Sequence, residues 1–195
     1  MTNKIKFPRP FSLKAALAVV FFFLAMSIFF LHLGFSAPIG LTIIGGVVLL
    51  ATIWLFILTF RSSISLKGSM LEKRGAFLTR RVNLKHAKLV KIETDNLGSV
   101  QLFVDSGTCK IRVALIIIND YNKMAVSLQL LGLISDGLNG NQNAVASQKL
   151  LTEHINYVNE HKSLSGSPLG EMISTSVLDT ATTAALDVEL FRIVS

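Results

Sequence analysis

The chain has 195 residues, of which 51% are hydrophobic and 16% charged, and its mean hydropathy is +0.56. This composition is too apolar for an ordinary soluble domain and predicts that part of the chain faces lipid. Cys109 is the only cysteine, which excludes an intramolecular disulfide bond and a cysteine-based zinc site.

Charge is unevenly distributed along the chain. Residues 1–60 carry four basic residues and no acidic one, residues 61–118 carry eleven basic and four acidic residues, and residues 119–195 carry four basic and eight acidic residues. A basic segment suits an anionic surface, and in a chain tied to a bilayer that surface is lipid rather than nucleic acid. We therefore expect anionic lipid of the inner leaflet as a partner and no nucleic acid.

Residues 1–60 have the pattern of a two-helix transmembrane hairpin. No Lys, Arg, Asp or Glu lies between Lys14 and Arg61, and this stretch divides into spans at about 15–33 and 39–60. Each span is near the length needed to cross a hydrocarbon core of about 30 Å. The short turn at 34–38 makes the helices antiparallel neighbours, and Gly40, Gly45 and Gly46 favour close packing, on the first helix or on an external partner helix.

The flanking charges predict the orientation of this hairpin. Basic residues precede and follow it, whereas the turn has none, so both termini and the following domain are expected in the cytoplasm. The chain would then be a multi-pass protein of the inner (cytoplasmic) membrane. A cleaved signal peptide is the alternative, and it leaves the domain in the same compartment.

Residues 61–136 change to short β-type runs separated by turn signals. Such spacing predicts a small antiparallel sheet or partial barrel closed by a helix. The expected strands are Ser63–Leu66, Met70–Lys73, Ala76–Thr79, Leu89–Ile92, Val100–Val104 and Lys110–Ile118. The closing helix is expected from an N-cap at Asn119 to about Gly137, with Tyr121, Met124, Leu128, Leu131 and Ile134 at helical spacing.

A membrane hairpin followed by SISLKGSMLEKRGAFLTRRVNLKHAKLVKI resembles the bacterial membrane-anchored pleckstrin-homology-like (PH-like) family. The resemblance implies a membrane α-helical hairpin plus an α+β, PH-like cytoplasmic domain at 61–136. It also implies a recognition module for lipid head groups or proteins rather than an enzyme. The phosphoinositide signature of eukaryotic members is not met, because Lys67 is followed by Lys73-Arg74-Gly75-Ala76, which argues against specific inositol-lipid recognition.

Basic clusters in this segment are the candidate lipid- or partner-binding residues, and a solvated strand edge is their alternative interpretation. They are Lys73, Arg74, Arg80, Arg81, Lys85 and Lys88. The chain has no P-loop, dinucleotide fingerprint, zinc-peptidase motif or serine-nucleophile elbow, so we expect no catalysis, cofactor or metal. His154 and His161, seven residues apart on one helix face, suit a solvated face better than a metal site.

Residues 137–195 are expected to form a helical extension, including a helix at Ala144–Lys162, and an acidic, apolar tail. Four apolar residues of the tail are predicted to bind another subunit, or else to pack on their own domain: Leu186, Leu190, Phe191 and Ile193. The leading functional hypothesis is a membrane-anchored binding module or accessory subunit of a larger membrane complex. The alternative is a stand-alone PH-like sensor or transport-associated protein that binds anionic lipid.

Overall fold

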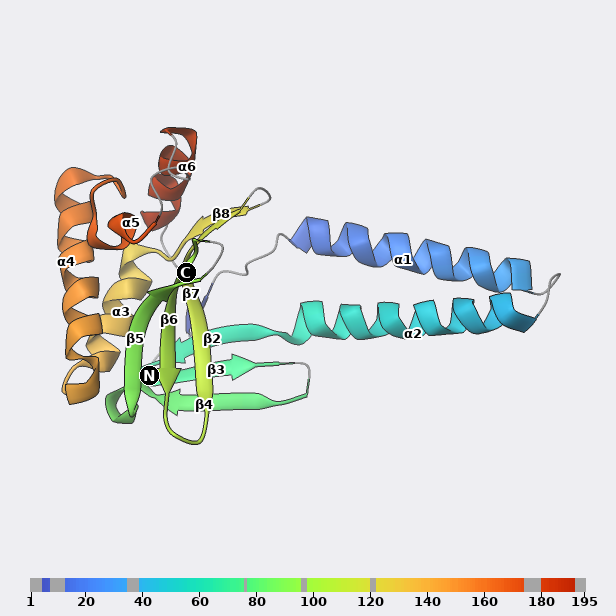
Figure 1. Cartoon of the computed structure of the whole chain (residues 1–195), viewed down its shortest axis with the longest axis horizontal. Coiled ribbons are helices and arrows are strands. Elements are labelled where there is room, and N and C mark those ends of the chain that lie inside the picture. Colours follow the sequence, from blue (N-terminus) through green and yellow to red (C-terminus); the bar gives the residue numbers. More distant parts are fainter. Residues whose placement is uncertain are drawn as a thin grey trace. The chain divides into compact units, whose positions relative to one another are not determined.

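The computed structural model describes residues 5–7, 13–34, 39–75, 77–95, 98–119, 122–173 and 180–191. The chain divides into two compact units. The first holds residues 1–10, 63–73 and 79–195, and the second holds residues 11–62 and 74–78. Within the described residues, the first unit has two antiparallel sheets and four α-helices, and the second has a pair of long α-helices (Figure 1).

The first sheet has the strand order β1-β2-β3-β4, with β1 at Ile5–Lys6, β2 at Ser63–Lys67, β3 at Met70–Arg74 and β4 at Thr79–Asn83. β1 pairs antiparallel with β2, so that Ile5 lies opposite Leu66, and the Phe7 amide donates to the Ile64 carbonyl at 2.9 Å. β1 is not predictable from the sequence, because two residues carry no readable alternation. Its pairing places the start of the chain in the same sheet as the segment after the long helices.

The second sheet is a meander of β5 (Leu89–Thr94), β6 (Val100–Asp105), β7 (Lys110–Asn119) and β8 (Asn122–Ala125). Alternation assigns its faces: Leu102 and Val104 are buried, whereas Phe103 and Asp105 are half-buried. In register, Lys91 lies opposite Phe103, which lies opposite Arg112. The two cations approach the Phe103 ring to 6.0 and 5.5 Å from its centroid and cover it on the outer face.

Four helices complete this unit: α3 (Leu128–Leu138), α4 (Val145–His161), α5 (Pro168–Glu171) and α6 (Thr180–Leu190). The Ser127 side chain caps α3 by accepting from the Leu130 amide. Asn141, in the loop before α4, donates through Nδ2 to the Leu84 carbonyl at 2.7 Å and the Ala87 carbonyl at 3.1 Å. These bonds hold the loop to the short 3-10 helix Leu84–His86, which lies between the two sheets in the chain. Leu84 of this helix belongs to the apolar core.

Most predicted strands lie where the pattern places them, but two regions differ. The strand expected at Ala76–Thr79 is β4 at Thr79–Asn83, because the Gly75 amide closes a turn on the Leu78 carbonyl at 2.8 Å. The helix expected from Asn119 begins only at Leu128, since residues 122–125 pair with β7 as β8. The apolar positions at 124 and 128 therefore belong to different elements, and Tyr121 lies outside the described residues.

The second unit contains α1 (Leu13–Gly34) and α2 (Ile39–Arg61), which lie side by side (Figure 1). Its turn residues 35–38 lie outside the described residues. Large apolar side chains along both helices are exposed, among them Phe21, Phe22, Phe29, Val47, Leu50 and Trp54. Trp54 packs against Phe77 with ring centroids 5.2 Å apart.

Among the described residues, no helix has the length and apolarity that a membrane crossing needs. The prediction of two membrane spans is therefore wrong. The fold class is therefore corrected from a membrane hairpin plus a domain to an α+β protein with two antiparallel sheets and six helices in its described part. The transmembrane character and the multi-pass inner-membrane location are withdrawn with it.

Candidate functional site

The candidate site is a hollow at one end of the two sheets, between β4 and the β6–β7 turn. We call it the β4–β7 mouth, and it is lined by Arg80, Gly107, Thr108, Cys109 and Lys110, with a volume of about 370 Å³. Arg80 stands two residues before buried Val82, and Cys109 stands two residues before buried Ile111. Alternation along a strand therefore directs both side chains to the core side, where the apolar core gives way to polar groups.

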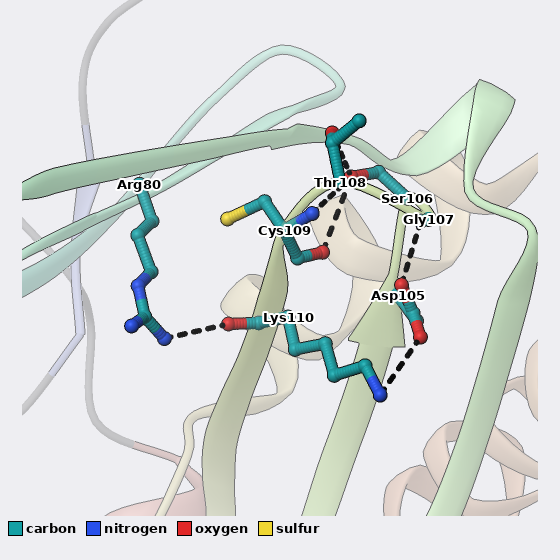
Figure 2. Close-up of polar contacts among 7 residues, drawn as sticks. All are labelled: Arg80, Asp105, Ser106, Gly107, Thr108, Cys109 and Lys110. Atoms are coloured by element: carbon teal, nitrogen blue, oxygen red, sulfur yellow. Dashed lines mark hydrogen bonds and ion pairs between the residues drawn. The ribbon is translucent and has the colours of Figure 1, made fainter.

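The β6–β7 turn is held by its own side chains (Figure 2). Asp105 Oδ1 accepts from the Gly107 amide at 2.6 Å, and Ser106 Oγ accepts from the Cys109 amide at 3.1 Å. The Ser106 amide in turn donates to the Cys109 carbonyl at 3.0 Å. Gly107 has φ +89°, in the region that favours glycine. The amides of Ser106, Gly107 and Cys109 therefore all have acceptors within the turn.

Three cations surround this turn. Arg80 Nη1 donates to the Lys110 carbonyl at 3.5 Å, a long bond from the first sheet to the second (Figure 2). Lys110 Nζ lies 3.5 Å from Asp105 Oδ2, and its side chain is 67% exposed. A Cβ on Gly107 would lie 2.9–3.0 Å from the Lys88 side chain, so that side chain packs against the turn at Gly107. In the described part of the chain, Arg80 and Lys88 form no ion pair with a carboxylate.

This arrangement can bind an anion. Arg80 and Lys110 are the charged residues that line the mouth, and guanidinium and ammonium donors are those that recognise phosphate and carboxylate oxygens. Cys109 is a free, half-buried thiol with no histidine bonded to it. Among the described residues, no group of three His, Cys, Asp or Glu side chains is placed to hold a metal ion.

The structure brings together only some of the predicted basic residues. Arg80 bonds the Lys110 carbonyl and Lys88 lies against Gly107, both next to the β6–β7 turn. Arg81 points to the other side of β4 and pairs with Glu72 at 3.1 Å. Lys73 and Arg74 end β3 and are exposed, and Lys85 is exposed on the 3-10 helix. Lys110 was missed as a site residue. The signal for it was its place at the start of the strand that follows the Asp105-Ser106-Gly107 turn.

The predicted helix-packing glycines differ from one another. A Cβ on Gly45 would lie 3.0 Å from the Leu31 backbone amide of α1, so this glycine lets the two helices approach closely. A Cβ on Gly40 or Gly46 would meet nothing within 4 Å. The first helix is therefore the packing partner at Gly45, which is one of the two alternatives that the sequence left open.

Two of the four predicted tail residues lie in the core of their own chain. Leu186 and Leu190, both on α6, are 0% and 1% exposed and belong to the main apolar cluster. Asp187 Oδ1 fixes α6 by accepting from the Leu164 amide at 2.7 Å. Phe191 is 41% exposed beneath Lys162, whose Nζ lies 5.2 Å from the ring centroid, and Ile193 lies outside the described residues.

The two histidines of α4 occupy opposite environments. His161 is exposed and stacks on Tyr157 with ring centroids 4.1 Å apart. His154 is 0% exposed, and neither ring nitrogen has a hydrogen-bond partner among the residues that the structure describes. Burial lowers the pKa of His154 from 6.5 to about 4, so the ring is neutral at pH 7. The solvated helix face expected for this pair therefore applies to His161 alone.

Comparison with known proteins adds no assignment to this geometry: no family model matches the chain, and neither a curated protein nor a solved structure matches it. The resemblance to the PH-like family therefore remains a prediction from the residues quoted above.

Proposed function

We propose that the protein is a non-catalytic binding module whose two-sheet unit takes a phosphate-bearing ligand at the β4–β7 mouth. The single observation that carries the proposal is that Arg80 and Lys110 line a hollow of about 370 Å³, while the Lys88 side chain lies against Gly107 of the same turn. Arg80 and Lys88 have no carboxylate partner among the described residues. Unneutralised cations at a concave surface attract anions and offer them charged donors at short range.

The free thiol provides a direct assay for this proposal. Cys109 is the only cysteine and lines the mouth, so its alkylation by neutral N-ethylmaleimide reports the occupancy of that hollow alone. The full chain, in a mild non-ionic detergent, is titrated with glycerol 3-phosphate while the alkylation rate is followed by mass spectrometry. We expect the rate to fall as the ligand fills the mouth.

Charge variants test the residues. Arg80→Gln should raise the concentration for half-protection about fivefold, because one charge contact near an anion contributes about 1 kcal/mol. Lys149→Gln is the matched control: Lys149 is exposed on α4, pairs with Glu153 at 3.7 Å, and should leave half-protection unchanged. Equal effects of the two variants would refute the site.

The same assay, run with different ligands, distinguishes a soluble phosphate from a lipid head group. Protection by soluble glycerol 3-phosphate indicates a small-molecule ligand. Protection only by detergent micelles doped with phosphatidic acid, and not by undoped micelles, indicates a lipid head group. Protection by an acidic peptide, with none by either phosphate arm, would overturn the proposal in favour of a protein ligand.

A second function is favoured by the long helices. Phe21, Phe22 and Phe29 of α1 are 63%, 62% and 59% exposed, and Leu50 of α2 is 69% exposed. Apolar surface of this extent marks a site of interaction, so the chain would also serve as an accessory subunit of a larger assembly. Affinity purification of the intact protein should recover a stoichiometric complex. Phe22→Ser should lose it, and a monomer alone would count against this role.

A further inference from the structure

The turn between β3 and β4 exposes two large apolar side chains. Phe77 is 62% exposed and Leu78 is 72% exposed, and we call this pair the β3–β4 tip. Neither residue lines the β4–β7 mouth. We propose that the β3–β4 tip inserts into the surface of an anionic lipid bilayer. This is a second binding surface, independent of the ligand site at the mouth.

The geometry of the turn holds these side chains away from the apolar core. The Gly75 amide donates to the Leu78 carbonyl at 2.8 Å and closes the turn. Leu71 on β3 and Val82 on β4 are buried, and every residue between them whose burial the structure describes is exposed or half-buried. The hairpin therefore leaves the core after these two residues and presents Phe77 and Leu78 at its end.

An aromatic contact supports the tip. Trp54 of α2 lies against Phe77 with ring centroids 5.2 Å apart, and Trp54 is itself 50% exposed. The two rings and Leu78 belong to the same compact unit, which holds residues 11–62 and 74–78 and which we call the helical unit. Aromatic rings beside leucine are the side chains that bind at the boundary between lipid head groups and acyl chains.

Charge determines which kind of surface the tip can bind. The sequence of the helical unit has no acidic residue, and its basic residues are Lys14, Arg61 and Arg74. Along the chain, Lys73-Arg74 precedes the tip and Arg80 follows it. Basic groups a few residues behind an apolar end match the order of groups in a bilayer, where phosphates lie outside the acyl chains. Each basic residue near an anionic bilayer favours binding about fivefold.

The experiment moves the only tryptophan of the chain to the tip. Trp54→Phe keeps an aromatic ring beside Phe77, and Leu78→Trp in the same chain provides a single fluorescent reporter. The full chain is diluted from a mild non-ionic detergent into vesicles whose acyl chains carry bromine, which quenches tryptophan fluorescence on contact. The vesicles contain either phosphatidylcholine alone or equal parts of phosphatidylcholine and phosphatidylglycerol.

We expect the Leu78→Trp reporter to be half-quenched at a lipid concentration about fivefold lower in the anionic vesicles than in the zwitterionic ones. Arg74→Gln should raise the anionic value about threefold after screening and leave the zwitterionic value unchanged. Phe77→Ser should raise both values about tenfold, because insertion of this ring is driven by its apolar area. Leu89→Trp, in place of Leu78→Trp, is the control: Leu89 is 41% exposed on β5 and should show no quenching.

Four results would overturn the inference. They are no quenching of the Leu78→Trp reporter, equal quenching of the Leu89→Trp control, equal half-quenching by the two kinds of vesicle, and unchanged values in Phe77→Ser. A stoichiometric protein complex that shields the Leu78→Trp reporter from acrylamide, with no quenching by either lipid, would overturn it in favour of a protein partner. None of these results bears on the mouth, because protection of Cys109 by glycerol 3-phosphate is measured separately.

Discussion

His154 leads to a quantitative prediction about stability and pH. The pKa of His154 is about 4 in the folded chain and 6.5 in the unfolded chain. Between pH 4 and pH 6.5 the unfolded chain therefore binds a proton at this residue that the folded chain does not. Stability from this group is complete above pH 6.5 and is lost as the pH falls toward 4. The full difference corresponds to about 3 kcal/mol, of which about 2 kcal/mol is lost between pH 7.5 and pH 5.

Urea titrations of the full chain at both pH values, followed by far-ultraviolet circular dichroism, measure this loss. His154→Leu should remove about 2 kcal/mol of the pH dependence. It should also be no less stable at pH 7.5, because it deletes two buried nitrogens that have no hydrogen-bond partner in the described part of the chain. His86→Leu, at an exposed site on the 3-10 helix, is the control and should keep the wild-type slope. A His154→Leu variant with an unchanged slope would refute the reasoning.

Three further substitutions test the packing described above. Gly107→Ala should cost about 1–3 kcal/mol in urea titrations, and more than Gly140→Ala, since both glycines have positive φ but only a Cβ on Gly107 meets a side chain. Leu186→Ala should lower stability by about 2–5 kcal/mol, whereas Val188→Ala, at a site 72% exposed, should change it by less than about 0.5 kcal/mol; equal losses would contradict the burial of α6. Asn141→Ala should cost about 1–3 kcal/mol and speed amide exchange in the 3-10 helix, and unchanged exchange would show that its two bonds do not hold that segment.

Local patterns predicted the elements whose signals are complete within a few residues. The strands at Val100 and Lys110 follow from alternation bounded by Asp and Gly turns, and the helix at 144–162 follows from its period. The boundary near residue 119 failed because Met124 and Leu128 fit a helical spacing by coincidence. Only the pairing of β8 with β7, which is a tertiary contact, separates them.

Only part of the β4–β7 mouth could be predicted from the sequence, because tertiary contacts bring its residues together. Arg80 was selected because it stands in a basic run, but nothing local distinguishes it from Arg81. Strand parity, once the sheet is known, directs Arg80 to the core side and Arg81 to Glu72. Lys110 lies 30 residues from Arg80, and the contact between them requires the two sheets to pack together. Burial of His154 likewise depends on the elements around α4 and not on its own spacing.

The pairing of β1 with β2 has a consequence for engineering. Because Lys6 lies opposite Ser65 and the Phe7 amide bonds to the Ile64 carbonyl, the chain leaves the first sheet and returns to it on adjacent strands. Topologically, everything between these residues is an insertion into a β-hairpin. A tight two-residue turn is the natural closure of such a hairpin. The helical pair could therefore be excised and its ends rejoined by a short loop, or exchanged for another insert, without altering the strand order of either sheet.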